Sequence, residues 1–175
     1  MSPLKVLVTY ASRSTSTADV AAEIGKIFEA NQLMVDVRPM EDVHDLTPYQ
    51  AVVAGSAIRF EQWLPEAMTF LETHQQALKE KPFAAFLVCM ALGIQPERGK
   101  RAASAWMQPV RDLVQPMSEG MFAGAIIPGK IKEWRYRIPF HVITLLLGGR
   151  SKKDYRDWDA IRAWAKGVAQ HVYSG

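Results

Sequence analysis

The residues best suited to chemistry are hydroxyl side chains near the start of the chain. Five of them lie between an apolar run at residues 6–10 and a helical pattern: Ser12, Ser14, Thr15, Ser16 and Thr17. A buried strand that leads through hydroxyl groups into a helix N-terminus forms an anion site, because the first helical N–H groups lack partners and the helix dipole is positive there. A phosphate group is the ligand that we expect. The alternative is that these hydroxyls only cap the helix.

A second candidate site follows another apolar run, where small residues precede a cation and two aromatic rings. Its members are Ser56, Ala57, Ile58, Arg59, Phe60 and Trp63. Phe60 or Trp63 could stack on a flat conjugated ring, while Arg59 and backbone amides meet the polar edge of that ring. The alternative is an amphipathic turn in which Trp63 packs the following helix against the core.

Small apolar residues follow a third strand-like run: Met90, Ala91, Leu92 and Gly93. Cys89 precedes them without a histidine or cationic residue nearby, so we interpret it as a packed core thiol and not as a nucleophile. The four histidines of the chain do not have the spacing of metal ligands. Because no catalytic triad or carboxylate pair stands out either, we assign no catalytic side chain and no metal, and leave the chemistry to a bound cofactor.

Positioning these three loops requires strands that end at one edge of a sheet. Apolar, β-branched runs recur at residues 5–10, 34–39, 51–56, 83–90 and 120–127, with helical patterns between them. Such alternation predicts an α/β fold with a doubly wound parallel sheet. Ligands of these sheets bind beyond the carboxyl ends of the strands. That rule selects the loops at residues 11–17, 57–63 and 91–99.

Helices are expected in four places along the chain. The ranges are the stretch from the hydroxyl loop to Asn31, then about 64–78, 101–113 and 158–172. Asp154 or Asp157 is the expected cap of the last helix.

A long segment, residues 129–153, interrupts this alternation, since it exceeds an ordinary strand-to-helix connection. The whole chain has a net charge of +3, but residues 130–156 hold eight basic and two acidic side chains, which leaves −3 for the remainder. Its apolar centre, residues 138–147, is too short to span a bilayer as a helix. The segment could lie on a membrane surface, line a hydrophobic substrate mouth or cap the core.

Length and composition indicate one domain over residues 1–175, of which 49% are hydrophobic. The first strand follows the N-terminus so closely that no signal peptide fits before it, and the single cysteine agrees with a reducing compartment. We therefore expect a cytoplasmic protein, with peripheral contact to the inner face of the membrane through residues 130–150 as an option. The local charge favours a surface or a partner over nucleic acid.

Taken together, these residues resemble the flavodoxin superfamily. The stretch LVTYASRSTSTADVAAEIG stands in the place of the phosphate loop, which usually reads hydroxyl residue, two spacers, glycine, one spacer and threonine. VVAGSAIRFEQWLPEAMTFL and AFLVCMALGIQPERGK are similar to the two flavin-flanking loops. The step SAIR, the long insertion after the fifth strand and KDYRDWDAIRAWA resemble flavodoxin-domain proteins akin to the menaquinone-dependent protoporphyrinogen oxidase of bacteria. The resemblance covers nearly the whole chain.

This resemblance implies a five-stranded sheet of order 2-1-3-4-5 that binds FMN non-covalently. The phosphate would be surrounded by Ser12, Arg13, Ser14, Thr15, Ser16 and Thr17. The isoalloxazine ring would be flanked by Ser56, Ala57, Ile58, Arg59, Phe60, Met90, Ala91, Leu92 and Gly93. Two residues depart from the family pattern. Thr15 replaces a glycine that allows close approach or a positive φ, and Glu61 stands where relatives often carry glycine.

The function implied is an FMN-dependent oxidoreductase or electron-transfer flavoprotein that works between a hydrophobic donor and a quinone-like acceptor. Protoporphyrinogen IX is the implied donor, with the basic insertion meeting its propionates or an anionic membrane face. A carrier that docks on a redox partner protein ranks lower, because such carriers are typically acidic around the flavin, whereas this chain is basic at its insertion. The third possibility is a flavin-free domain that uses the insertion to contact a membrane or a protein, which Thr15 and Glu61 favour.

Overall fold

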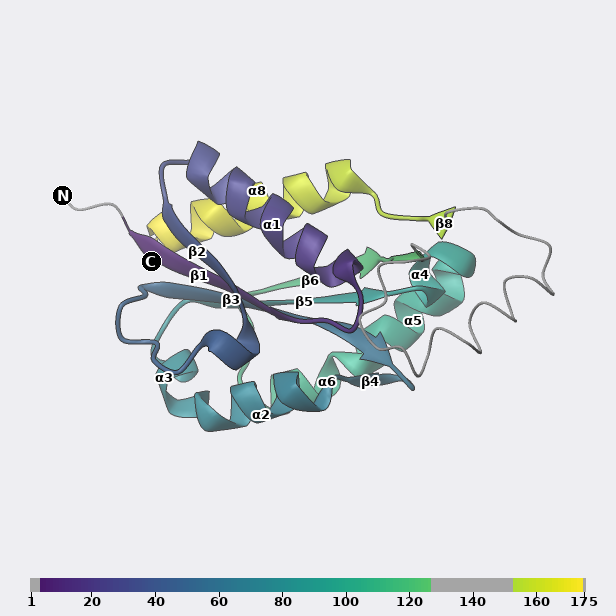
Figure 1. Ribbon diagram of the computed structural model, residues 1–175, viewed down its shortest axis with the longest axis horizontal. Coiled ribbons are helices and arrows are strands. Elements are labelled where there is room, and N and C mark those ends of the chain that lie inside the picture. The colour runs from purple at the N-terminus through teal and green to yellow at the C-terminus, as the bar shows by residue number, and fades with distance from the viewer. Residues whose placement is uncertain (1–3, 127–152, 175) are drawn as a thin grey trace.

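The computed structural model describes residues 4–126 and 153–174, and its centre is a parallel β-sheet (Figure 1). The strands lie in the order β2-β1-β3-β5-β6. Their bounds are β1 (Lys5–Ala11), β2 (Met34–Pro39), β3 (Ala51–Arg59), β5 (Phe83–Cys89) and β6 (Ser118–Ala123). Counted along the chain, the five parallel strands have the order 2-1-3-4-5, so the predicted fold class is confirmed.

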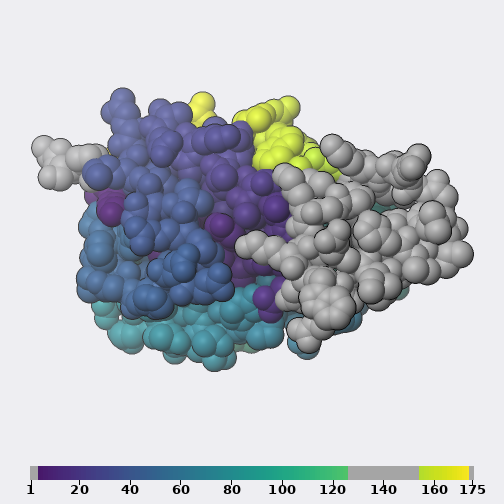
Figure 2. All heavy atoms as spheres, viewed as in Figure 1, coloured from purple at the N-terminus to yellow at the C-terminus, as the bar shows by residue number. Residues whose placement is uncertain are grey.

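Helices cover both faces of this sheet (Figure 1). One face carries α1 (Thr15–Ala30) and α8 (Trp158–Ser174), which lie side by side. The other face carries α2 (Pro65–Thr73), α3 (Gln75–Lys79), α5 (Pro96–Trp106) and α6 (Gln108–Leu113). Two short elements complete it, the 3-10 helix η1 (Met40–Asp42) and α4 (Ala91–Ile94). In the space-filling view, the region of α1, β1 and β2 faces the viewer, with α8 above it and α2 below (Figure 2).

Alternation of side chains along the strands creates two hydrophobic cores. Val6 and Val8 pack under α1 and α8, whereas Leu7 between them packs under the helices of the other face. All three are fully buried. On the α8 side, Phe86 meets Trp164 edge to face, with 6.2 Å between ring centroids. Burial on both faces is why these strands read as nearly continuous apolar runs.

Several boundaries differ from the sequence-based expectation. β3 continues past residue 56 to Arg59, because β4 (Gln62–Trp63) pairs back onto it as an antiparallel hairpin. The expected loop at 91–99 is mostly helical, since α4 and the start of α5 occupy it. The helix expected at 101–113 starts at Pro96 and is interrupted at Met107, directly before α6, whose first turn contains a proline that lacks an N–H donor. The helix expected at 64–78 is divided into α2 and α3 at His74.

The flanks of the expected insertion meet at one place. β7 (Ala125–Ile126) pairs antiparallel with β8 (Lys153–Asp154), just beyond the carboxyl end of β6. Residues 127–152 of the insertion lie outside the described residues. No helix in the described ranges has the length and apolar character needed to cross a membrane.

Candidate functional site

The hydroxyl loop joins β1 to α1 at the carboxyl edge of the sheet. Ser14 is the N-cap residue of α1, yet its side chain makes no capping hydrogen bond, and the first turn contains no acidic residue. The hydroxyl oxygens of Thr15 and Thr17 are shielded from solvent and have no partner among the described residues. Since a buried hydroxyl without a partner is costly, this helix end fits an anionic group that would accept from it, such as a phosphate.

Thr15 does not strain the backbone of this loop. Among the described residues other than glycine, a positive φ occurs only at Gln32, Phe60 and Glu61. Position 15 is the first residue of α1 and therefore does not need the left-handed conformation that favours glycine. Thr15 is therefore compatible with the backbone of the phosphate loop, and it is one of the residues that line the adjacent cavity.

Two other hydroxyls of the loop hold its shape. Ser12 donates to the carbonyl oxygen of Ser14, which closes the turn. Ser16 is buried, and its hydroxyl accepts the backbone N–H of Ala125 at 3.0 Å. Four of the five loop hydroxyls therefore fall into two pairs. Ser12 and Ser16 support the loop, whereas Thr15 and Thr17 have no partner among the described residues.

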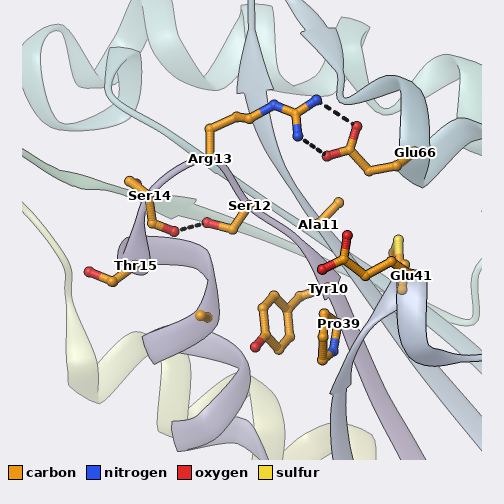
Figure 3. A pocket seen from close by; sticks show the side chains of 11 residues that line it. Tyr10, Ala11, Ser12, Arg13, Ser14, Thr15, Pro39, Glu41 and Glu66 are labelled. Atoms are coloured by element: carbon orange, nitrogen blue, oxygen red, sulfur yellow. Dashed lines mark hydrogen bonds and ion pairs between the residues drawn. The ribbon is translucent and has the colours of Figure 1, made fainter. Parts of the chain in front are cut away.

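Arg13 reaches from this loop to α2. Its Nη1 lies 2.7 Å from Oε1 of Glu66, and its Nη2 donates to Oε2 at 2.9 Å (Figure 3). The two side chains are 40% and 32% exposed. This fork-like geometry is the strong form of an arginine–carboxylate pair, and it compensates the charge of the arginine.

A cavity of about 180 Å³ adjoins the loop on the side of β2 (Figure 3). Its walls include Ser12 and Thr15 from the loop, Tyr10 from β1, and Glu41 from η1. Partial burial raises the pKa of Tyr10, and the neighbouring carboxylates of Asp42 and Glu41 raise it further. The tyrosine is therefore a neutral phenol near pH 7, beside a wall that carries negative charge.

The first predicted ring-flanking segment is the β3–β4 hairpin. Arg59 pairs with Gln62 across it, and the two residues between them have positive φ, 49° at Phe60 and 63° at Glu61. These values are typical of a type I′ turn, which favours glycine or asparagine. Phe60 is 83% exposed, with the Arg59 guanidinium 5.2 Å from the centroid of its ring. The hairpin thus presents an aromatic ring and a cation at the carboxyl edge.

Other residues of this segment serve the hairpin itself. Ser56 is fully buried, accepts the N–H of Leu64 at 3.1 Å and donates to the carbonyl oxygen of Ala57 at 2.8 Å. Trp63 is 4% exposed and packs in the core, as the amphipathic-turn interpretation expects. Ala57 and Ile58 pack against the same core.

The second ring-flanking segment begins α4. Met90 is its N-cap residue, and Ala91 and Leu92 pack against the core under α5. Gly93 lies against Tyr155, since a Cβ placed on Gly93 would be 2.4 Å from the tyrosine Cβ and Cγ. The segment that returns to the domain after β8 is therefore in contact with this predicted site segment.

Cys89, at the end of β5, agrees with the packed-thiol interpretation. It is 5% exposed, and burial raises the pKa of its thiol.

All three predicted segments follow adjacent strands, because β1, β3 and β5 are neighbours in the sheet. The cavity beside the phosphate loop is lined by residues 12–15, but not by residues 56–60 or 90–93. Within residues 4–126 and 153–174, no three metal-binding side chains are grouped. Sequence reasoning did not select Glu41 and Glu66, because no local motif marks them and Glu66 is 53 residues from Arg13.

Comparison with known proteins yields one family. The family model for the flavodoxin domain matches residues 7–149. A comparison with curated proteins found no match.

Solved structures share the architecture of this chain. A flavodoxin from the domain Archaea is 19% identical, with 97% of this chain and 99% of that chain covered and a TM-score of 0.61. Flavodoxin 2 from Bacillus cereus is 17% identical, with 95% and 99% covered and a TM-score of 0.60. A flavodiiron core from Synechocystis is 14% identical, with 98% of this chain and 36% of that chain covered and a TM-score of 0.64. Likenesses at this identity show a shared fold.

Proposed function

This chain belongs to the flavodoxin domain family, whose cofactor is FMN, and we propose that it is an oxidoreductase acting between a hydrophobic donor and a quinone-like acceptor. The observation that carries the proposal is the uncapped N-terminus of α1, beside which the buried hydroxyls of Thr15 and Thr17 have no partner in the described part of the chain. When bound, FMN supplies the redox chemistry. The protein supplies binding, orientation and electrostatics.

The phosphate would be held by the first N–H groups of α1 together with the hydroxyls of Thr15 and Thr17. Ser12 and Ser16 keep the loop in shape through their own bonds. The ring system would lie toward the β3–β4 hairpin and the start of α4, where Phe60 offers a face for stacking. Arg59 would meet the polar edge of the ring, as its position beside Phe60 allows.

An apolar, anionic donor is supported by the surroundings of this edge. Phe60 is 83% exposed and Ile94 is 60% exposed, and both lie just beyond the carboxyl ends of strands. The basic insertion starts and returns beside the site, since Ala125 binds Ser16 and Tyr155 packs on Gly93. We therefore propose protoporphyrinogen IX as the donor, with its propionates meeting basic residues between 130 and 156.

Titration with FMN tests the cofactor. The protein should quench flavin fluorescence with saturation, and no quenching up to high micromolar FMN would exclude this function. The FMN-loaded protein should then oxidise protoporphyrinogen IX under anaerobic conditions with a menaquinone analogue as acceptor. Tight FMN binding without donor-dependent turnover would support FMN as the cofactor but reject protoporphyrinogen IX as the donor.

An electron carrier is the second candidate, because the surface beside the phosphate loop is acidic. Glu41 and Glu66 line the cavity there, and Asp42 follows Glu41 in the chain. An acidic surface of this kind suits docking on a basic partner reductase. Reduction by a flavodoxin reductase without turnover of a small donor would favour the carrier. Membrane contact through residues 130–150, which lie outside the described residues, is tested by flotation with anionic vesicles.

A further inference from the structure

We infer that Glu66 weakens the selection of FMN over unphosphorylated riboflavin, because it neutralises the arginine of the phosphate loop. The inference rests on the proposed function, since it concerns the phosphate end of the same site. It assigns a specificity role to a residue of α2 that lies outside the loop itself.

Arg13 of the phosphate loop and Glu66 of α2 form a bidentate ion pair. Arg13 directly precedes Ser14, the N-cap residue of α1, and is the cation of the loop that holds the predicted phosphate site. Both of its terminal nitrogens are engaged by Glu66, at 2.7 and 2.9 Å. A guanidinium held in this fork keeps its position, but its charge is offset by the carboxylate.

The cavity beside the phosphate loop has more carboxylates than cations among its described lining residues. Among the described residues that line it, the carboxylates of Glu41 and Glu66 stand against one guanidinium, that of Arg13. A phosphate monoester carries nearly two negative charges at pH 7, whereas riboflavin carries none. The two carboxylates of this wall therefore oppose the phosphate. Among the described residues, the helix N–H groups and the threonine hydroxyls supply the attraction.

Removing the charge of Glu66 should reverse that balance. Glu66→Gln keeps the size of the side chain and one oxygen that can accept from Arg13, but it removes the negative charge that Glu66 places beside the guanidinium. A partly exposed pair contributes little to stability, so the variant is expected to fold. The gain in affinity should be seen for FMN and not for riboflavin, because only FMN carries the phosphate.

The experiment compares FMN and riboflavin titrations of the unaltered protein, Glu66→Gln, Arg13→Gln and Glu72→Gln. Glu72 is the matched control, because it is exposed on the same helix and does not line the cavity. We expect Glu66→Gln to lower the Kd for FMN about tenfold and Arg13→Gln to raise it about tenfold, with riboflavin unchanged in both. Glu72→Gln should bind both flavins as the unaltered protein does, and added salt should reduce the differences.

Unchanged or weaker FMN binding by Glu66→Gln would overturn the inference, as would an equal change for riboflavin, which would indicate an effect through the fold. If the unaltered protein binds FMN, these outcomes reject this inference alone. If it binds neither flavin, the proposed function fails and the inference fails with it.

Discussion

The hydroxyl of Ser16 accepts the backbone N–H of Ala125 at 3.0 Å, although 109 residues separate the two in the chain. Ser16 lies in the first turn of α1, and Ala125 is the first residue of β7, from which the insertion departs. The proposed phosphate site and the base of the insertion are therefore joined by a buried hydrogen bond.

Replacing Ser16 by alanine tests how much this hydrogen bond contributes to the stability of the fold. The change leaves a buried N–H without an acceptor and should lower the free energy of unfolding by about 1–3 kcal/mol. Urea denaturation with an unchanged m-value measures it. Ser104→Ala, which removes an exposed hydroxyl on α5, should leave the midpoint in place. Equal midpoints for both variants would show that the Ser16 bond is not needed.

Two glycines should respond to alanine with opposite signs. At Gly93 a Cβ would lie 2.4 Å from Tyr155, so Gly93→Ala forces the segment after β8 to move and should cost about 1–3 kcal/mol. At Gly167, inside α8, nothing lies within 4 Å of an added Cβ. Gly167→Ala should therefore stabilise the protein by roughly 0.5–1 kcal/mol. Thermal denaturation compares the two, and a lower midpoint for Gly167→Ala would contradict the packing described.

The hairpin turn should gain stability from a glycine at position 61. Glu61 has a φ of 63°, where a side chain is strained and glycine is not. Because glycine also makes the unfolded chain more flexible, the net gain of Glu61→Gly should be roughly 0.5–1 kcal/mol in the free energy of unfolding. Glu61→Ala keeps the strain and removes only the charge, so it should give no gain. Equal gains for both variants would assign the effect to charge.

Acid should weaken the edge strand β2 through Asp36. The hydroxyl of Tyr49 donates to its carboxylate at 2.7 Å, and Lys5 lies 3.0 Å away. These partners, Tyr49 first, lower the pKa of Asp36 in the folded protein. Because its pKa is lower in the folded protein, ionised Asp36 contributes to the free energy of unfolding. This contribution is complete above the ordinary pKa of 3.8 and is lost as the pH falls below it.

Tyr49→Phe should therefore lower the free energy of unfolding by about 1–2 kcal/mol at pH 7 and by less at low pH. Urea denaturation at both pH values measures the difference. Tyr173→Phe is the control, since the Tyr173 hydroxyl donates to the carbonyl oxygen of Asn31, which does not titrate. A cost of Tyr49→Phe that does not change with pH would reject the coupling to Asp36.

Thr17→Val should separate cofactor binding from stability. The Thr17 side chain is 1% exposed, and its hydroxyl has no partner among the described residues, so its loss should not destabilise the protein without flavin. Loss of a phosphate donor should weaken FMN binding about tenfold and leave riboflavin unaffected. Thr9→Val removes a similar unpartnered hydroxyl within β1 and is the control. FMN binding that is unchanged in Thr17→Val would place the phosphate elsewhere.

Local patterns in the sequence were sufficient for the five parallel strands and for the main helices between them, although not for every boundary. The apolar run at residues 34–39 is strand β2 with the same bounds, and Asn31 is the C-cap residue of α1. Asp157 caps α8 by accepting the N–H of Ala160, as one of the two predicted caps. Alternating apolar runs and helical periods, together with the hydroxyl loop, were enough to place the three candidate segments at one sheet edge, because each signal depends on residues that are near neighbours in the chain.

The tertiary structure alone decided which of these residues remain open to a ligand. Glu66 neutralises Arg13 across 53 residues, Ser16 is occupied by Ala125, and Arg156 binds Asp19 across 137 residues. It also decided that Trp63 packs inward while Phe60 stays exposed, since this depends on how β4 folds back on β3. Periodicity reports which face of an element is apolar, but it contains no information on which distant side chain will stand opposite, and that is set only when the layers pack.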